Sequence, residues 1–304
     1  MGEVEQVLET LAQGRVKVVD FRFTDLVGRW RHKGLDAAAV DAALLGDGIL
    51  IDGSAIPGWR EVQESDLLLK PDLGATFLDP FSAQPTLVIL CDGAEPGTGL
   101  GYERDPRSVA ERLESWLAQQ RVADRVSVAP DLGFYLFDDV RVELGPMRQS
   151  YALTASEHRT SSGQAYAGGN PGHRPAAEGA YLALPPADHM ADIRAEMTQI
   201  LATLGFGGLQ QAHGPGAGQN EIMFAADGVV TTADRIQIAK YAIQQVAASY
   251  GKSASFMAKP VADEAGSALH VHLALWQQGR PVFAGQGYAD LSGQCLAFIA
   301  GIIH

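Results

Sequence analysis

Two histidines spaced two residues apart, His270 and His272, are the residues whose spacing points most directly to chemistry. They lie in the apolar run 269–275, which follows Gly266 and Ser267 and has the composition of a strand. Because side chains alternate across a strand, both imidazoles are expected on one face. That arrangement suits a metal ion or a phosphate group, although a metal would need a third ligand. The alternative is a pair of histidines on the solvent-exposed face of an ordinary sheet.

The elements that would position these side chains follow from hydrophobic periodicity and turn residues. We predict helices over 3–12, 106–120 (capped by Asp105, with Pro106 first), 192–204, and from an N-cap at Thr232 to Tyr250. We predict strands over 16–23, 86–91, 126–128 and 134–137. The Gly- and Pro-rich stretch 93–101 predicts a domain boundary after a small sheet-rich domain, and 161–175 is predicted to be a surface loop.

Composition limits the classes of function. The chain has 304 residues, of which 46% are hydrophobic, so it is long enough for about two globular domains. Its net charge of −13 argues against general nucleic-acid binding. No apolar run is long enough to span a bilayer, and we expect an acidic cytoplasmic protein without membrane contact. Cys91 and Cys295 lie in apolar runs, which favours buried free thiols in a reducing compartment over a disulfide.

Short motifs along the chain carry a more specific signal, because they occur in a fixed order. They are Asp52-Gly53-Ser54 with Gly58-Trp59, Ser65-Asp66, Lys70-Pro71-Asp72, Leu78-Asp79-Pro80-Phe81, Tyr102–Arg107, His173-Arg174-Pro175, Tyr181 with Pro185-Pro186, Asp192-Ile193-Arg194, Ala217–Glu221, Lys252–Met257, Lys259-Pro260, and the pair His270 and His272. In these motifs the chain resembles the glutamine synthetase family over nearly its whole length.

The resemblance implies an α+β fold, with a β-grasp-like N-terminal domain over 1–101 and a glutamine-synthetase-type α/β catalytic domain over 102–304. It implies a parent reaction in nitrogen metabolism, the ATP-dependent ligation of glutamate and ammonia, with ATP and Mg²⁺ or Mn²⁺ as cofactors. It also implies a ring-shaped homo-oligomer in which neighbouring subunits share each site. The family's catalytic domain continues beyond the position matched by His304, so the resemblance implies a C-terminally incomplete catalytic domain.

The resemblance also assigns roles to individual residues. Asp52 would be catalytic and would assist ammonium in the neighbouring subunit's site, although it could equally cap its own turn. Tyr181 and His272 would contact the nucleotide cofactor. Gly266 would lie in the loop that binds glutamate. The metal ligands would be, in chain order, Asp131, His213, Glu221 and His270.

Several positions depart from the family's pattern. Gly133 and His213 stand where the resemblance places metal-binding glutamates, and Gly208 stands where it places a glutamate that contacts nucleotide. Ala265 replaces an asparagine of the glutamate-binding loop. The next two residues after His213 are Gly214 and Pro215, which favours a solvent-facing loop histidine over a metal ligand. Glu221 and His270 could be relics in a polar cavity.

Because losing a carboxylate that holds a catalytic metal costs orders of magnitude in rate, we expect the parent activity to be weak or absent. The first hypothesis is a degenerate paralogue, a pseudoenzyme that binds or regulates. The second is an active glutamate–amine ligase of altered substrate, completed by a further C-terminal segment. The third is a structural subunit of a mixed ring. Any residual metal site would have mixed nitrogen and oxygen ligands, which suit zinc or manganese better than magnesium.

Overall fold

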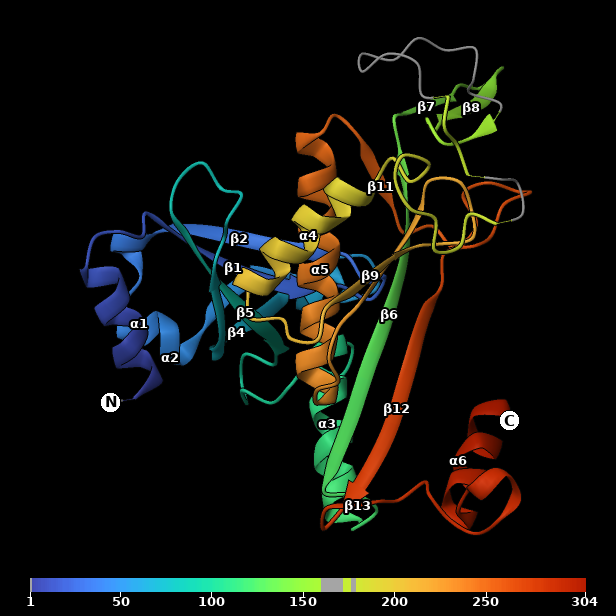
Figure 1. Cartoon of the computed structure of the whole chain (residues 1–304). Helices are drawn as coiled ribbons and strands as arrows, with labels where there is room; N and C mark the ends of the chain where they lie inside the picture. Colours follow the sequence, from blue (N-terminus) through green and yellow to red (C-terminus); the bar gives the residue numbers. More distant parts are fainter. Residues whose placement is uncertain (1, 160–171, 176–178) are drawn as a thin grey trace. The chain divides into compact units, whose positions relative to one another are not determined.

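Figure 1 shows the computed structural model of the chain, which describes residues 2–159, 172–175 and 179–304. Most of the predicted loop over 161–175 lies outside the described residues. The chain divides into two compact units, each described by itself below. The first contains residues 1–125 and 276–280, and the second contains residues 126–275 and 281–304.

The first unit is built on a five-stranded sheet in the order β2-β1-β5-β4-β3, in which β1 and β5 are parallel and the other pairs antiparallel. Its elements are α1 (Glu3–Ala12), β1 (Val18–Thr24), β2 (Trp30–Asp36), η1 (Ala37–Ala39), α2 (Ala42–Asp47), β3 (Ile49–Asp52), η2 (Gly53–Ala55), η3 (Val62–Glu64), β4 (Asp66–Leu78), β5 (Thr86–Ala94) and α3 (Pro106–Gln119). Five consecutive residues of β1 and the first six of β5 are buried, as expected for central strands. Alternate side chains of these strands, including Phe21 and Ile89, form one core with Trp59.

The second unit is built on a six-stranded sheet with the path β13-β12-β6-β10-β9, with β11 pairing to β6. Figure 1 shows β6 and β12 as long strands side by side. The elements are β6 (Arg125–Phe137), β7 (Asp139–Leu144), β8 (Gln149–Thr154), α4 (Ala191–Thr203), β9 (Gln210–His213), β10 (Gln219–Met223), α5 (Val229–Ser249), β11 (Ser253–Ser255), β12 (Leu269–Gln277), β13 (Arg280–Pro281), η5 (Tyr288–Asp290) and α6 (Gly293–Ile303). β7 and β8 form a separate hairpin.

The predicted elements agree with the structure except at two places. The helix capped by Asp105 is confirmed, since its carboxylate accepts a bond from the Ser108 amide and Pro106 is the first helical residue. The prediction of an N-cap at Thr232 is wrong, because α5 begins at Val229. The Thr232 hydroxyl donates instead to the Val128 carbonyl. The two short strands predicted over 126–128 and 134–137 are one continuous strand, β6.

The predicted α+β class is confirmed, with helices and antiparallel strands in both units. Cys91 and Cys295 are free and buried, as predicted. Within the described parts of the chain, no helix is both long enough and apolar enough to cross a membrane.

Candidate functional site

Three of the predicted metal ligands lie on neighbouring strands of the second unit. In the antiparallel pairing of β10 with β6, Glu221 lies opposite Gly133 and Met223 lies opposite Asp131. Opposed residues share a face and alternate residues of one strand do too, so Asp131 and Glu221 point to the same side of the sheet. His270, on β12, brings its Nδ1 to 3.5 Å from Asp131 Oδ2. The strand predicted for the two histidines is therefore confirmed, and both are exposed.

The negative charges on this face of the sheet favour the binding of a cation. Burial raises the pKa of Glu221, and the nearby Asp131 carboxylate raises it further, while His270 and His213 act in the opposite direction. Asp131 Oδ1 is buried and has no hydrogen-bond partner. Two carboxylates that repel one another, one with an unpaired buried oxygen, would be stabilised by a cation. Asp131, Glu221 and His270 therefore form a candidate ligand set for one cation with mixed nitrogen and oxygen ligands.

The position between these carboxylates is closed by backbone. A Cβ on Gly133 would lie 3.0 Å from both the amide nitrogen and the carbonyl oxygen of Ala268. The Gly133 amide donates to that same Ala268 carbonyl at 2.8 Å. A side chain at 133 would therefore have to displace the chain that leads into β12.

The segment that covers Gly133 is itself held firmly. The Ser267 amide donates to the Ala258 carbonyl at 2.9 Å, and Gln219 Nε2 donates to the Gly266 carbonyl at 2.9 Å. A Cβ on Gly266 would lie 2.7 Å from the Ala258 carbonyl oxygen, so glycine is needed there. Gly266, which the family resemblance places in the substrate loop, thus has its carbonyl already paired within the protein.

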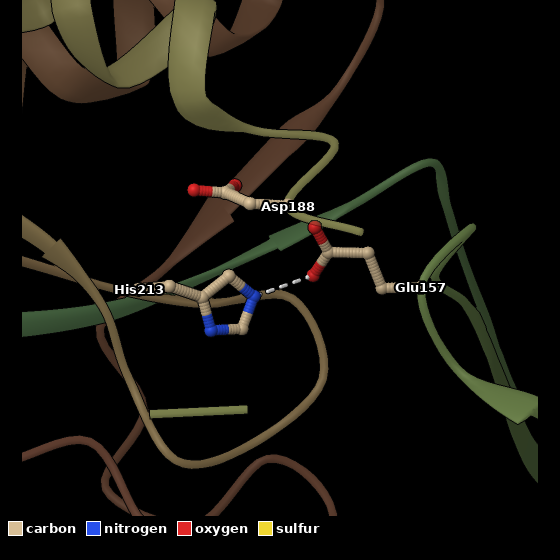
Figure 2. Close-up of side chains that lie close together, drawn as sticks. All are labelled: Glu157, Asp188 and His213. Carbon is tan, nitrogen blue, oxygen red and sulfur yellow. Dashed lines mark hydrogen bonds and ion pairs between the residues drawn. The ribbon is translucent and has the colours of Figure 1, made fainter. Parts of the chain in front are cut away.

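The expectation that His213 is a solvent-facing loop histidine is wrong. His213 is the last residue of β9 and only 1% exposed. Its Nε2 lies 2.9 Å from Glu157 Oε2 (Figure 2), and its Nδ1 lies 2.6 Å from the Gly214 carbonyl. The strand register pairs it with Asn220, whereas Glu221 pairs with Ala212. Because successive residues of a strand point to opposite faces, His213 points to the face of the sheet opposite to that of Glu221.

Among the residues that the structure describes, one group of three could offer ligand atoms within 4.8 Å of one another: Glu157, Asp188 and His213. All three are buried. Asp131, Glu221 and His270 are not part of it. The four metal ligands expected from the sequence are therefore divided between two places rather than gathered in one.

Both predicted nucleotide contacts are accessible, whereas the Gly208 position offers none. His272 is exposed on β12, and Tyr181 is 60% exposed. Gly208 has φ +60°, and a Cβ there would lie 3.0 Å from the Ala225 Cβ. Because this left-handed conformation disfavours residues with a Cβ, position 208 is shaped for glycine and offers no side-chain contact.

Asp52 belongs to the first unit, at the end of β3. Its Oδ1 accepts from the Ser54 amide at 2.9 Å and from the Ser54 hydroxyl at 2.6 Å, and these bonds lower the pKa of Asp52. The alternative that Asp52 caps its own turn is therefore confirmed. The carboxylate remains exposed, so the cap leaves its second oxygen accessible.

Sequence reasoning missed Glu157, Asp188 and the part that Arg194 plays with them. Asp188 lies two residues before the N-cap of α4 and accepts two bonds from Arg194, so an acidic residue ahead of a helix was an available signal. Glu157 has no local signal, because it meets His213 across 56 residues of sequence.

Comparison with known proteins places this fold in a family. The family model for the glutamine synthetase β-grasp domain matches residues 15–96, and the model for the glutamine synthetase catalytic domain matches residues 103–304. The chain therefore belongs to the glutamine synthetase family, a family of ligases.

Similar proteins agree with this assignment. The chain is 42% identical over 303 residues to glutamine synthetase of Rhizobium meliloti, covering 100% of this chain and 65% of that protein. It is 42% identical over 302 residues to glutamine synthetase of Escherichia coli K12, covering 98% and 64%. The chain thus spans about 65% of the length of the curated relatives it matches.

Solved structures show the same fold. The Plasmodium falciparum glutamine synthetase matches with a TM-score of 0.90 at 21% identity, covering 100% of this chain and 60% of that one. A GmaS–ADP complex matches with a TM-score of 0.77 at 23% identity, covering 98% and 62%.

Proposed function

We propose that this chain is a binding or regulatory member of the glutamine synthetase family, a pseudoenzyme in which ATP-dependent ligation of glutamate and ammonia is absent or very weak. The observation that carries the proposal is Gly133. The position offers no ligand atom, and the Ala268 backbone occupies the space that a side chain would need. The deciding experiment is glutamate-dependent release of phosphate from ATP by the purified chain, for which we expect no turnover.

The divalent cations that the family implies fit these residues only in part. Asp131, Glu221 and His270 would hold one ion, for which zinc or manganese is better suited than magnesium. A paired site would need a carboxylate at 133, and His213 is engaged elsewhere. A paired-ion mechanism is therefore not supported by the residues present, and we derive no catalytic step from it.

ATP fits the described residues no better. The accessible His272 and Tyr181 could contact a nucleotide, but Gly208 cannot. We therefore propose that any nucleotide binding is weak. An active ligase of altered amine substrate is the alternative outcome of the activity test. A structural subunit of a mixed ring is a further alternative.

We further propose that the chain forms a homo-oligomer of the ring type, as a single ring or a smaller assembly. The loop Asp52–Trp59 keeps the family's motif and is held in a defined shape. The Arg104 guanidinium donates to the Gly58 carbonyl at 2.8 Å, and the Tyr102 hydroxyl donates to the Trp59 carbonyl. Light scattering should give the mass of an oligomer, that is, two or more times the chain mass of 32.3 kDa. A strict monomer at high protein concentration would contradict this prediction.

A further inference from the structure

The buried group of Glu157, Asp188 and His213 (Figure 2) has the residue types of a metal site, but each of these side chains already makes hydrogen bonds within the protein. Glu157 is fully buried and accepts three bonds. Its Oε1 accepts from the His189 amide at 2.7 Å, and its Oε2 accepts from the Gly218 amide at 2.6 Å and faces His213 Nε2 at 2.9 Å. Three of the roughly four lone-pair sites of this carboxylate are therefore occupied by contacts within the protein.

His213 faces an acceptor with each ring nitrogen. Nδ1 meets the Gly214 carbonyl, which cannot donate, and Nε2 meets the Glu157 carboxylate. A proton on each ring nitrogen turns both contacts into hydrogen bonds to acceptors, and the ring in that form is an imidazolium ion. Burial by itself lowers the pKa of His213, but the hydrogen bond and charge of Glu157, together with the Gly214 carbonyl and the charge of Asp188, outweigh burial and raise it. An imidazolium has no free lone pair and cannot bind a metal.

Asp188 is similarly committed. The Arg194 guanidinium donates to both of its oxygens, at 2.6 Å and 3.2 Å, and the Met190 amide donates to Oδ1 at 3.0 Å. Arg194 continues to Asn220, the register partner of His213. The two carboxylates are thus balanced by a guanidinium and an imidazolium. None of the side-chain oxygens or nitrogens of Glu157, Asp188 or His213 is buried without a partner, in contrast to Asp131 Oδ1.

We propose that His213 is a fixed internal cation, which takes the place that a bound metal ion would otherwise fill between Glu157 and Asp188. The cluster then joins three segments that are distant in sequence: the turn at 155–158, the residues 188–190 that lead into α4, and the loop 213–218 between β9 and β10. This inference goes beyond the proposed function, because it predicts how the second unit is stabilised whether or not the chain turns over ATP.

The test is thermal unfolding of the full chain and of His213→Glu, each in EDTA and with added magnesium, manganese or zinc. Any rise that zinc or manganese gives the wild-type midpoint should come from Asp131, Glu221 and His270, and it should be equally large in His213→Gln. His213→Glu would bury three carboxylates together, so its midpoint should fall by roughly 5–10 °C in EDTA and recover with a divalent cation. His213→Gln should fall without recovery, because an amide supplies no charge.

Two further measurements keep the test decisive if His213→Glu does not fold. The exposed His32, whose Nδ1 lies 2.7 Å from the buried Asp20 carboxylate, serves as a control, and His32→Gln should leave the midpoint nearly unchanged. Nitrogen-15 NMR of the wild-type His213 ring at neutral pH should show two protonated nitrogens. A neutral ring, or a stoichiometric zinc or manganese ion that raises the wild-type midpoint and is lost in His213→Gln, would overturn the proposal.

Discussion

The purified chain should form no measurable glutamine from glutamate, ammonia and ATP. Transfer of a phosphoryl group onto a carboxylate brings several negative charges together, and the barrier falls only if positive charge is fixed around them. Here Gly133 supplies no ligand atom, Gly208 supplies no side-chain contact to nucleotide, and the His213 ring is hydrogen-bonded to Glu157. Each lost electrostatic contribution is normally worth several kcal/mol, and about 1.4 kcal/mol corresponds to tenfold in rate. The measurement is a coupled phosphate-release assay, read as glutamate-dependent turnover.

The matched positive control is a full-length relative at about 42% identity, such as the Rhizobium meliloti glutamine synthetase, assayed under the same conditions. Release of phosphate at a comparable rate by this chain would reject the pseudoenzyme proposal. Turnover that appears only with an amine other than ammonia would instead favour the ligase of altered substrate.

Substituting Gly133 should destabilise the second unit rather than restore a metal site. Gly133→Ala places a Cβ 3.0 Å from two backbone atoms of Ala268, which lie in a segment fixed by bonds to Ala258 and Gln219. Overpacking against backbone costs about 1–3 kcal/mol, more than the roughly 0.4–1 kcal/mol that replacing glycine gains from the unfolded chain. Gly133→Glu should cost more, since it adds a charge beside Asp131 and Glu221. Chemical denaturation measures the loss.

Gly293 provides the matched control for this substitution, because it lies at the first position of α6 and a Cβ added there would have nothing within 4 Å. Gly293→Ala should therefore keep or slightly raise the free energy of unfolding. If Gly133→Ala were as stable as Gly293→Ala, the Ala268 backbone would not be the obstacle described above. If Gly133→Glu gained tight magnesium binding, the prediction that substitution does not restore a metal site would be wrong.

Elements with strong local signals could be predicted from the sequence. The Asp105 cap with Pro106 at the first helical position defines the start of α3, because one carboxylate satisfies an amide that the helix leaves unpaired. The apolar run from Thr86 onward predicts a buried central strand, and β5 is one. These signals depend on neighbours within a few residues, so no knowledge of the rest of the fold is needed.

Features that depend on distant residues could not be predicted. The interruption at Asp131 and Gly133 reads as a break between two short strands, yet pairing with β10, β11 and β12 keeps β6 continuous. The residues Gly214 and Pro215 correctly indicate a turn, but the preceding His213 is buried because Glu157 meets it across 56 residues. The sequence places the start of α5 too late because threonine is a favoured N-cap residue, yet the Thr232 hydroxyl donates to the distant Val128 carbonyl and the helix begins at Val229.

Calorimetric titration of the full chain with magnesium tests the central claim most directly, namely that the residues present do not form a paired-ion site. We predict no magnesium site of micromolar affinity. Any weak binding of a single ion should be lost in Glu221→Gln, because this substitution removes one of the two carboxylates on that face of the sheet. Two magnesium ions bound at micromolar affinity would contradict the account.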